Sequence, residues 1–372
     1  MEIAYHTHWK EAFMQMEDPR KARGKRYPWW VLLTLLASAM VSGHTFPSAI
    51  HQWVHEHADL IRQRIWPRIP SDATLRRALQ QMPLAELQAV MMPPAPAAAH
   101  ADRVGEWQAH ALDGKTVRGA TTHGQPVHVV REVEHGSGAV IQQQVVAAKT
   151  NEIPVVQHVL AGRDLRGIVI TVDALHTQQA TTQLILHQGG HYLLIAKANQ
   201  RALYQAIADG FDAPAWPDEQ RMPWSQTEKA HGRLETRVLE RIACPTPLPP
   251  FWPGVRQVLR RTCRTVELPS RRQRTVETTY ALTDLAVEQA DLDILAALWR
   301  GHWTIENRVH HVLDVTWHED ACQVHTGAAP VALTLLRSGI TDALRRAGVS
   351  NIAAALRSFA AAAERAVAFV AG

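Results

Sequence analysis

Three acidic residues lie far apart in the sequence at places where an α/β protein can bring them together. Asp113 follows a short strand-like segment and begins the expected turn Asp113-Gly114-Lys115. Asp173 ends the apolar run 167–173, GIVITVD, which is typical of a strand buried on both faces. Glu306 lies in a late segment with helical apolar spacing. Ligand sites in α/β sheets collect at the carboxyl ends of strands, so we expect all three acids to share one cleft.

Such a cluster of carboxylates indicates a site for divalent metal ions. Like charges repel one another unless a cation lies between them, and oxygen ligands suit Mg²⁺ or Mn²⁺. Each acid also has an ordinary interpretation, because Asp before Gly commonly forms turns and most helical glutamates are solvated. Asp173 resists this interpretation, since an acid at the end of a fully apolar strand is more often functional. For the third position, Glu306 has three competitors, Asp314, Glu319 and Asp320.

Apolar spacing divides the 372-residue chain into a helical part and a mixed part. Helical spacing extends over residues 29–91, and the proline-rich stretch 92–97 closes this part as a linker. Prolines within 209–254 indicate loops and short strands inserted before a last long helical stretch, 292–315. Between the linker and the insertion we expect, in order, strands at 107–113, 127–133 and 140–147, a helix at 153–160, a strand at 167–173, a helix at 177–186 and a strand at 192–196.

Composition indicates a folded protein with a mildly basic surface. Lys and Arg number 39 against 35 Asp and Glu, a net charge of +4 that permits nucleic acid as a partner without demonstrating it. The three cysteines form no C-x-x-C pair, so we expect neither a disulfide framework nor a zinc ribbon. The apolar stretch 29–40 contains Thr34 and Ser38 and is shorter than the roughly 20 residues that span a bilayer, so we expect a buried helix. No secretory signal is visible, and we expect a cytoplasmic protein.

Several cations and polar side chains are candidate DNA contacts, because phosphate oxygens accept most protein–DNA hydrogen bonds. Lys197 and Asn199 are favoured because they follow a buried strand, whereas any one of the others, taken alone, is more often a surface charge. The inserted region holds six arginines within 260–274, a pattern that resembles a basic hairpin lying along a duplex. The candidates are Lys115, Arg118, Lys197, Asn199, His231, Arg233, Arg260, Arg261, Arg264, Arg271, Arg272, Arg274 and, beside Glu306, His302 and Arg308.

Six short strings of this sequence occur in the same order in one known family. They are DGKTVRG at 113–119, KTNEI at 149–153, VDALHTQ at 172–178, YLLIAKANQ at 192–200, HGRLE at 231–235 and RGHWTIEN at 300–307. One such string would be weak evidence, whereas six collinear strings are specific. On these strings the chain resembles the H-repeat-associated insertion-sequence transposases, and the similarity continues through HHVLDVTWHED at 310–320. It covers about residues 10–345, including the helical part before residue 92.

The resemblance implies a DDE transposase with an α/β fold. The implied architecture is an RNase H-like mixed sheet flanked by helices, with a mainly β insertion before the last catalytic helix and an all-helical N-terminal domain. By motif, Asp113, Asp173 and Glu306 carry over as the catalytic triad and as ligands of two Mg²⁺ (or Mn²⁺) ions. Glu306 comes 133 residues after Asp173, which leaves room for the insertion. Where related enzymes often place tyrosine, arginine and lysine around the final glutamate, this chain has His302, Trp303 and Arg308.

The resemblance also implies an activity, partners and a division into domains. The activity is Mg²⁺-dependent DNA strand cleavage and strand transfer of an insertion-sequence element. The partners are double-stranded DNA, as terminal repeats and target, and a second copy of the chain in a homodimer, with no membrane, in the bacterial cytoplasm and on the nucleoid. The expected parts are a helical N-terminal domain at 1–92, a linker at 93–104, the catalytic core at 105–200 and 285–345, a β-rich insertion at 201–284 and a C-terminal helical tail at 346–372.

Two other interpretations compete with this one. In a zinc hydrolase, His302, Glu306 and His310 would share one helical face, but the H-E-x-x-H order is absent and the two aspartates stay unexplained. A catalytically inactive DNA-binding protein derived from a transposase, or a nuclease that cuts without joining, would keep every motif named above.

Overall fold

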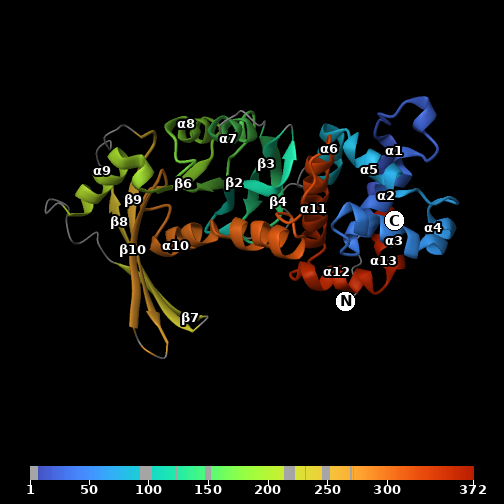
Figure 1. The fold of residues 1–372 in the computed structure, drawn as a ribbon. Helices are drawn as coiled ribbons and strands as arrows, with labels where there is room; N and C mark the ends of the chain where they lie inside the picture. The colour runs from blue at the N-terminus through green and yellow to red at the C-terminus, as the bar shows by residue number, and fades with distance from the viewer. Residues whose placement is uncertain are drawn as a thin grey trace.

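A mixed β-sheet extends from the left end of the molecule to its middle in Figure 1, and the terminal helices lie on the right. The computed structural model describes residues 7–92, 103–122, 124–146, 152–212, 223–230, 232–244, 252–268, 270 and 272–372. Within these ranges ten strands form one sheet in the order β4-β3-β2-β5-β6-β10-β9-β8-β7, with β1 paired to β2. The strands are β1 (Arg103–Val104), β2 (Trp107–Thr122), β3 (Gln125–Glu134), β4 (Val140–Val146), β5 (Ile168–Val172), β6 (His191–Ala196), β7 (Trp224–Ala230), β8 (Arg233–Ala243), β9 (Gln257–Glu267) and β10 (Arg272–Thr283).

The centre of the sheet is apolar on both faces and is covered by helices on each side. Strands β2, β5 and β6 run parallel, which explains why the sequences of β5 and β6 are continuous apolar runs. On one face, α7 (Glu152–Leu160), α8 (Gln179–His187) and α9 (Arg201–Asp212) pack over a core that contains Ile170 and Leu194. On the other face, α10 (Leu292–Gly301) packs over Val169. This confirms the expected α/β fold with a mixed sheet between helices.

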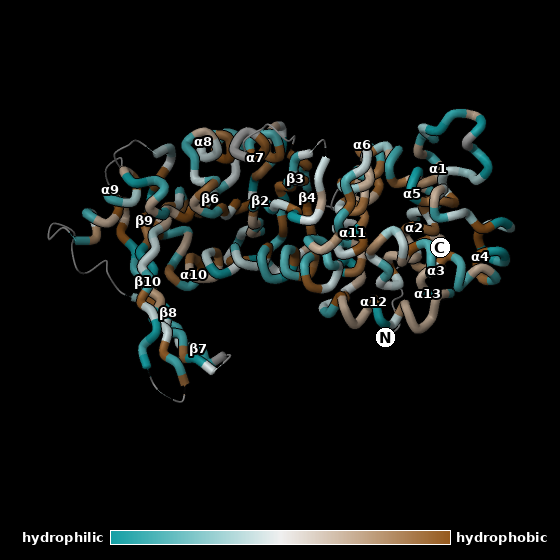
Figure 2. The backbone as a smooth tube through the Cα atoms, in the orientation of Figure 1, coloured by the Kyte–Doolittle hydropathy of each residue, from teal (hydrophilic) through white to brown (hydrophobic). Residues whose placement is uncertain are grey.

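The inserted strands extend this sheet. Strand β10 pairs antiparallel with β6, Leu282 opposite Leu194, and β9, β8 and β7 follow in turn. The expectation of loops and short strands within 209–254 is wrong for β8, which has 11 residues, and the strands that follow it, β9 and β10, have 11 and 12. The half of β10 near β6 is buried, whereas its other half is exposed. In Figure 2 the outer ends of these strands alternate between hydrophilic and hydrophobic residues.

The helices at the two ends of the chain form one packed unit. Helix α2 is buried along its length, and α13 packs against both α1 and α2. The apolar tail therefore completes the core of the N-terminal helices (Figure 1). Within the described ranges, no helix is long and apolar enough to cross a membrane, and Cys244, Cys263 and Cys322 form no disulfide. These helices are α1 (Trp9–Gln15), α2 (Trp29–Val41), α3 (Pro47–Glu56), α4 (Ala58–Arg64), α5 (Asp72–Gln80), α6 (Leu84–Met91), α11 (Ala329–Arg346), α12 (Ile352–Ala360) and α13 (Ala363–Ala371).

The helix expected at 292–315 continues beyond α10 as two π-helical segments, Ile305–His310 and Val312–Thr316. Its apolar residues recur every four positions, which is wider than the spacing of an α-helix, about 3.6 residues per turn. A helix that includes π-helical turns has more residues per turn, so it keeps such a stripe on one side. The stripe is fully buried against the core of the terminal helices and consists of Ile305, Val309, Leu313 and Trp317.

We predict that the Phe369→Ala substitution destabilises the terminal helices by about 3 to 5 kcal/mol, the usual effect of truncating a buried phenylalanine. The Phe369 ring lies 6.0 Å from the Trp9 ring and 5.3 Å from the Phe359 ring. Urea unfolding followed by tryptophan fluorescence measures the change. Met14→Ala, at an exposed position of α1, is the control and should stay within about 0.5 kcal/mol of wild type. An equal stability of both variants would show that the tail does not contribute to this core.

Candidate active site

Asp113 and Asp173 lie side by side because of the register between two parallel strands. Leu112 of β2 is opposite Val172 of β5, so the next residue of each strand is an aspartate. The sequence predicted a turn at Asp113-Gly114, and this is wrong. Strand β2 continues to Thr122 because its pairing with β3 extends past this point, with Asp113 opposite Arg131. Asp113 therefore lies in the middle of a strand, at the level where β5 ends.

A histidine completes a compact group of possible ligand atoms with the two aspartates. One carboxylate oxygen of Asp113, one of Asp173 and one ring nitrogen of His176 all lie within 4.8 Å of one another. His176 Nε2 is 3.9 Å from Asp113 Oδ1, and the imidazole is buried. Asp173 shapes the turn after β5, because its Oδ1 accepts hydrogen bonds from the backbone amides of Leu175 and His176.

His176 was missed as a site residue by sequence reasoning. The available signal was its place in the VDALHTQ string, three residues after Asp173. A histidine this close to a candidate ligand, in a tight turn, deserved consideration as a further ligand. Two other buried residues, Thr171 and His135, gave no signal in the sequence.

Glu306 is exposed and is not part of this compact group, but its neighbours on the helix contact the same strands. His302, four residues before it, places Nδ1 3.0 Å from Thr171 Oγ1 on β5. His310, four residues after it, places Nδ1 3.8 Å from Asp113 Oδ2. Asp314 contacts Lys115 on β2. His302, His310 and Asp314 therefore contact β5 and β2 from one helix, and Glu306 occupies the position between the two histidines along that helix.

Burial favours the neutral form of two histidines near the acids, His302 and His310. Burial lowers the pKa of His302 to about 4 and places the pKa of His310 well below its ordinary value. Thr171 connects two of the buried histidines, because its hydroxyl contacts His135 Nε2 at 2.9 Å as well as His302. Gly301 packs directly on His135, and a Cβ at that position would lie 2.1 Å from His135 Nδ1. The structure does not group His302, Glu306 and His310 as metal ligands, so the zinc hydrolase interpretation finds no support.

Three of the predicted DNA contacts lie elsewhere than expected. Lys115 is engaged by Asp314, Glu319 and Asp320, and its side chain is only 10% exposed. His302 is buried beneath the acids. Arg260 forms a two-point ion pair with Glu240, at 2.7 and 2.9 Å. In each case the polar group that would contact a phosphate already contacts another residue of the chain.

The remaining predicted contacts are mostly on the surface. Arg261 is partly buried between two tryptophan rings, and Asn199 is exposed but donates through Nδ2 to the carbonyl oxygen of Ala174 at 2.8 Å. His231 and Arg271 lie outside the described residues. The exposed cations are Arg118, Lys197, Arg233, Arg264, Arg272, Arg274 and Arg308.

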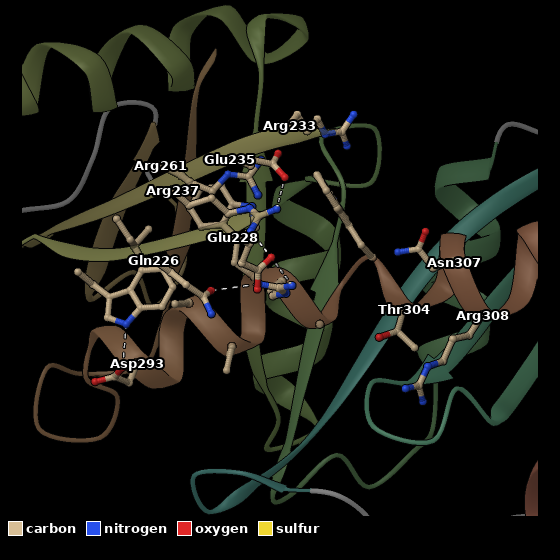
Figure 3. Close-up of a pocket in the computed structure, with 18 residues that line it drawn as sticks. Gln226, Glu228, Arg233, Glu235, Arg237, Arg261, Asp293, Thr304, Asn307 and Arg308 are labelled. Carbon is tan, nitrogen blue, oxygen red and sulfur yellow. Dashed lines mark hydrogen bonds and ion pairs between the residues drawn. The ribbon is translucent and has the colours of Figure 1, made fainter. Parts of the chain in front are cut away.

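A groove of about 860 Å³ runs between the inserted strands and the helix that carries Glu306 (Figure 3). The Arg261 guanidinium lies 4.9 Å from the ring centroid of Trp299 and 5.3 Å from that of Trp303. Trp303 itself is 40% exposed. Asn307 and Arg308, the two residues that follow Glu306, line the same groove and lie at one end of it in Figure 3. The groove therefore reaches the helical turn that carries Glu306.

Ion pairs fix the inserted strands to α10 along this groove. Arg300 donates to both carboxylate oxygens of Glu228, at 2.6 and 2.8 Å, and Arg237 donates to Glu228 as well, at 3.0 Å. Hydrogen bonds from Arg300 and Arg237 lower the pKa of Glu228 to about 2. Trp224 Nε1 donates to Asp293 at 2.7 Å. These contacts hold β7 and β8 at a set distance from the helix.

Comparisons with known proteins agree on one family. The profile of the transposase DDE domain matches residues 105–340, and a DDE_Tnp_1-associated profile matches residues 10–93. "Putative transposase YncI" of Escherichia coli O157:H7 is 26% identical over 324 residues, which cover 84% of this chain and 81% of YncI. "H repeat-associated putative transposase YhhI" of E. coli K12 is 30% identical over 230 residues, 59% of each chain.

A solved structure shows a more distant likeness. It is a piggyBac transposase synaptic complex with hairpin DNA, at a TM-score of 0.46 and 8% identity, covering 98% of this chain and 78% of that one. This likeness is too weak to support conclusions about the site.

We predict that His135 makes stability depend on pH. Burial lowers its pKa to about 3 in the folded protein, against about 6.5 when unfolded. The contribution of neutral His135 to the free energy of unfolding is complete above pH 6.5. It is lost as the pH falls below this value, because the imidazole then binds a proton in the unfolded chain only. Between pH 6 and 4, His135→Gln should lower the slope of unfolding free energy against pH by about 1.4 kcal/mol per pH unit. The exposed control His55→Gln should keep the wild-type slope, and an unchanged slope in His135→Gln would refute the prediction.

Proposed function

This chain belongs to the family of transposases with a DDE domain, enzymes that act on DNA, and we propose that it catalyses Mg²⁺-dependent strand cleavage and strand transfer of an insertion-sequence element. The proposed catalytic residues are Asp113, Asp173 and Glu306. The single observation that carries the proposal is the β2–β5 register, which places Asp113 and Asp173 next to each other at the end of a buried strand.

The donor atoms fit divalent metal ions. Two carboxylates and one imidazole offer ligand atoms within 4.8 Å of one another, and adjacent carboxylates are stabilised when a cation lies between them. We propose that Asp113, Asp173 and Glu306 would hold two such ions, and that His176 would add a nitrogen donor. Bound Mg²⁺ or Mn²⁺ would activate the attacking oxygen and stabilise the leaving 3′ oxygen of a phosphodiester.

The surrounding residues suit the task of holding DNA. Arg308 and Asn307 lie in the groove directly after Glu306, where they can contact phosphates next to the scissile bond. Lys197 is exposed just after β6, at the end of the sheet that carries Asp173. Arg264, Arg272 and Arg274 are exposed on β9 and β10 and would follow a duplex along the insertion.

We further propose that two copies act together on nucleoid DNA in the bacterial cytoplasm. Transposition joins two element ends to a target, so a homodimer would supply one site to each end. The alternative is a protein that binds or cuts DNA without joining it. A strand-transfer assay on DNA with a free 3′-OH end distinguishes this alternative from the proposed activity.

We predict that Asp173→Asn abolishes Mg²⁺-dependent cleavage and leaves duplex affinity within about twofold, because the substitution removes a metal ligand and no phosphate contact. Cleavage of a labelled duplex that contains the element's end, and its binding at equilibrium, measure the two effects. Asp164→Asn is the matched control, since Asp164 lies in the loop at the opposite end of β5 and pairs with Arg166. Normal cleavage by the Asp173→Asn protein would remove this residue from the site.

We predict that the triple substitution of Arg264, Arg272 and Arg274 by Ala weakens duplex binding for all sequences alike. Each phosphate contact contributes about 0.9 to the slope of log affinity against log salt concentration, so the slope should fall by up to about 3. Titrations at several salt concentrations measure this slope. Arg166→Ala serves as a single-site control on the far side of β5. A slope equal to that of wild type would exclude these three arginines from the DNA interface.

A further inference from the structure

A lysine on the strand of Asp113 contacts the chain segment that follows Glu306. Lys115 lies two residues after Asp113 and therefore on the same face of β2. Its Nζ contacts Asp314, lies 3.2 Å from Glu319 Oε2 and lies 3.4 Å from Asp320 Oδ1. Glu319 is fully buried. A buried carboxylate needs a cationic partner, because an unpaired charge in the interior strongly destabilises the fold.

The same two segments also meet through the backbone. A Cβ at Gly119 would lie 2.3 Å from the carbonyl oxygen of Asp320, so only glycine allows the segment to come this close. The Asp320 carboxylate accepts a hydrogen bond from the Arg118 amide at 3.1 Å. Further along, Ala120 and Val324 form a parallel bridge. The outer half of β2 and residues 319–324 therefore run against each other.

These contacts account for two motif strings that the acidic site leaves unexplained. Besides Asp113, DGKTVRG contains Lys115 and Gly119, and HHVLDVTWHED contains Asp314, Glu319 and Asp320. Lys115 of the first string contacts the three acidic residues of the second string, and Gly119 of the first string packs on the backbone of Asp320. The two strings are thus complementary halves of one contact.

This contact acts on the helix that carries Glu306. Asp314 lies on the same helix as Glu306, eight residues further on. The helix between them has π-helical turns, which are rare and are frequently found at functional sites. A helix with an uncommon geometry needs contacts on both sides to keep its register. The buried stripe supplies one side, and Lys115 supplies the other.

We propose that Lys115 is a positioning residue that, together with Gly119, holds residues 314–320 on β2 and so fixes Glu306 at its working distance from Asp113 and Asp173. The proposal rests on the proposed function for the role of Glu306. It replaces the expectation that Lys115 contacts DNA. With its side chain 10% exposed and three carboxylates around its ammonium group, Lys115 has no room for a phosphate.

The test compares Lys115→Met with Lys197→Met, an equal loss of charge at an exposed position that is a proposed DNA contact. Hydrogen exchange of the free protein, which needs neither metal nor DNA, should accelerate in peptides covering 304–320 for Lys115→Met only. Its cleavage rate should fall about 100-fold, the effect expected of a small misplacement of a catalytic group. Duplex affinity and its salt dependence should stay at wild-type values. Lys197→Met should show the reverse, with weaker binding, a flatter salt dependence and normal exchange.

Two further variants keep the proposal testable if Lys115→Met does not fold. Asp314→Asn removes one partner whose side chain is about one third exposed, and Gly119→Ala separates the segments without changing any charge. Both should accelerate exchange at 304–320 and slow cleavage. Normal exchange and cleavage in these variants, or weaker DNA binding with normal exchange in Lys115→Met, would overturn the proposal.

Failure of the proposed function would give a different result. Asp173→Asn would then cleave normally, whereas the exchange measurement would still report whether Lys115 holds the segment. If Asp173→Asn is inactive and the Lys115 variants behave as wild type, the positioning role alone is refuted.

Discussion

The site depends on the parallel pairing of β2 with β5. This register makes two aspartates direct neighbours, an arrangement that electrostatic repulsion opposes. It is maintained because the strands are fixed by backbone hydrogen bonds and by apolar layers on both faces of the sheet. Arg131 offsets part of this repulsion, because it lies opposite Asp113 on β3 and is fully buried. A pair of like charges held by a rigid scaffold is a preorganised receptor for cations.

The helix that carries Glu306 shows how a simple spacing serves two surfaces at once. Its four-residue period places Ile305, Val309 and Leu313 in the core of the terminal helices, and the adjacent stripe toward β2 and β5. In a regular α-helix, residues four apart shift gradually around the helix axis, so both stripes would turn away from the surfaces they contact. The π-helical turns have more residues per turn and prevent this shift. The terminal helices, α11 to α13 included, therefore pack against the side of this helix that carries Ile305, Val309 and Leu313. Through this core, the N-terminal and C-terminal parts of the chain contribute to one structure.

The insertion extends the sheet that carries Asp113 and Asp173. Because β10 pairs with β6, the inserted strands continue the hydrogen-bonded sheet. The ion pair of Arg300 with Glu228 and the hydrogen bond from Trp224 to Asp293 then hold β7 on α10, beside the groove. The six arginines expected to form one basic surface are divided by strand alternation. Arg260 and Arg261 point to opposite faces, one to Glu240 and Phe211 and the other between two tryptophans.

The sequence by itself determined the α/β class, the family and the closeness of Asp113 to Asp173. Apolar periodicity and short motifs depend on residues that are near one another in the chain, and these signals can be read directly. Only the tertiary structure decided that β2 continues past Asp113, that His176 joins the acids and that Lys115 faces inward. The partners of Lys115 begin 199 residues away, and pairings over such separations leave no local pattern. For the same reason, a lysine that looks like a DNA contact in the sequence is an internal ion pair in the fold.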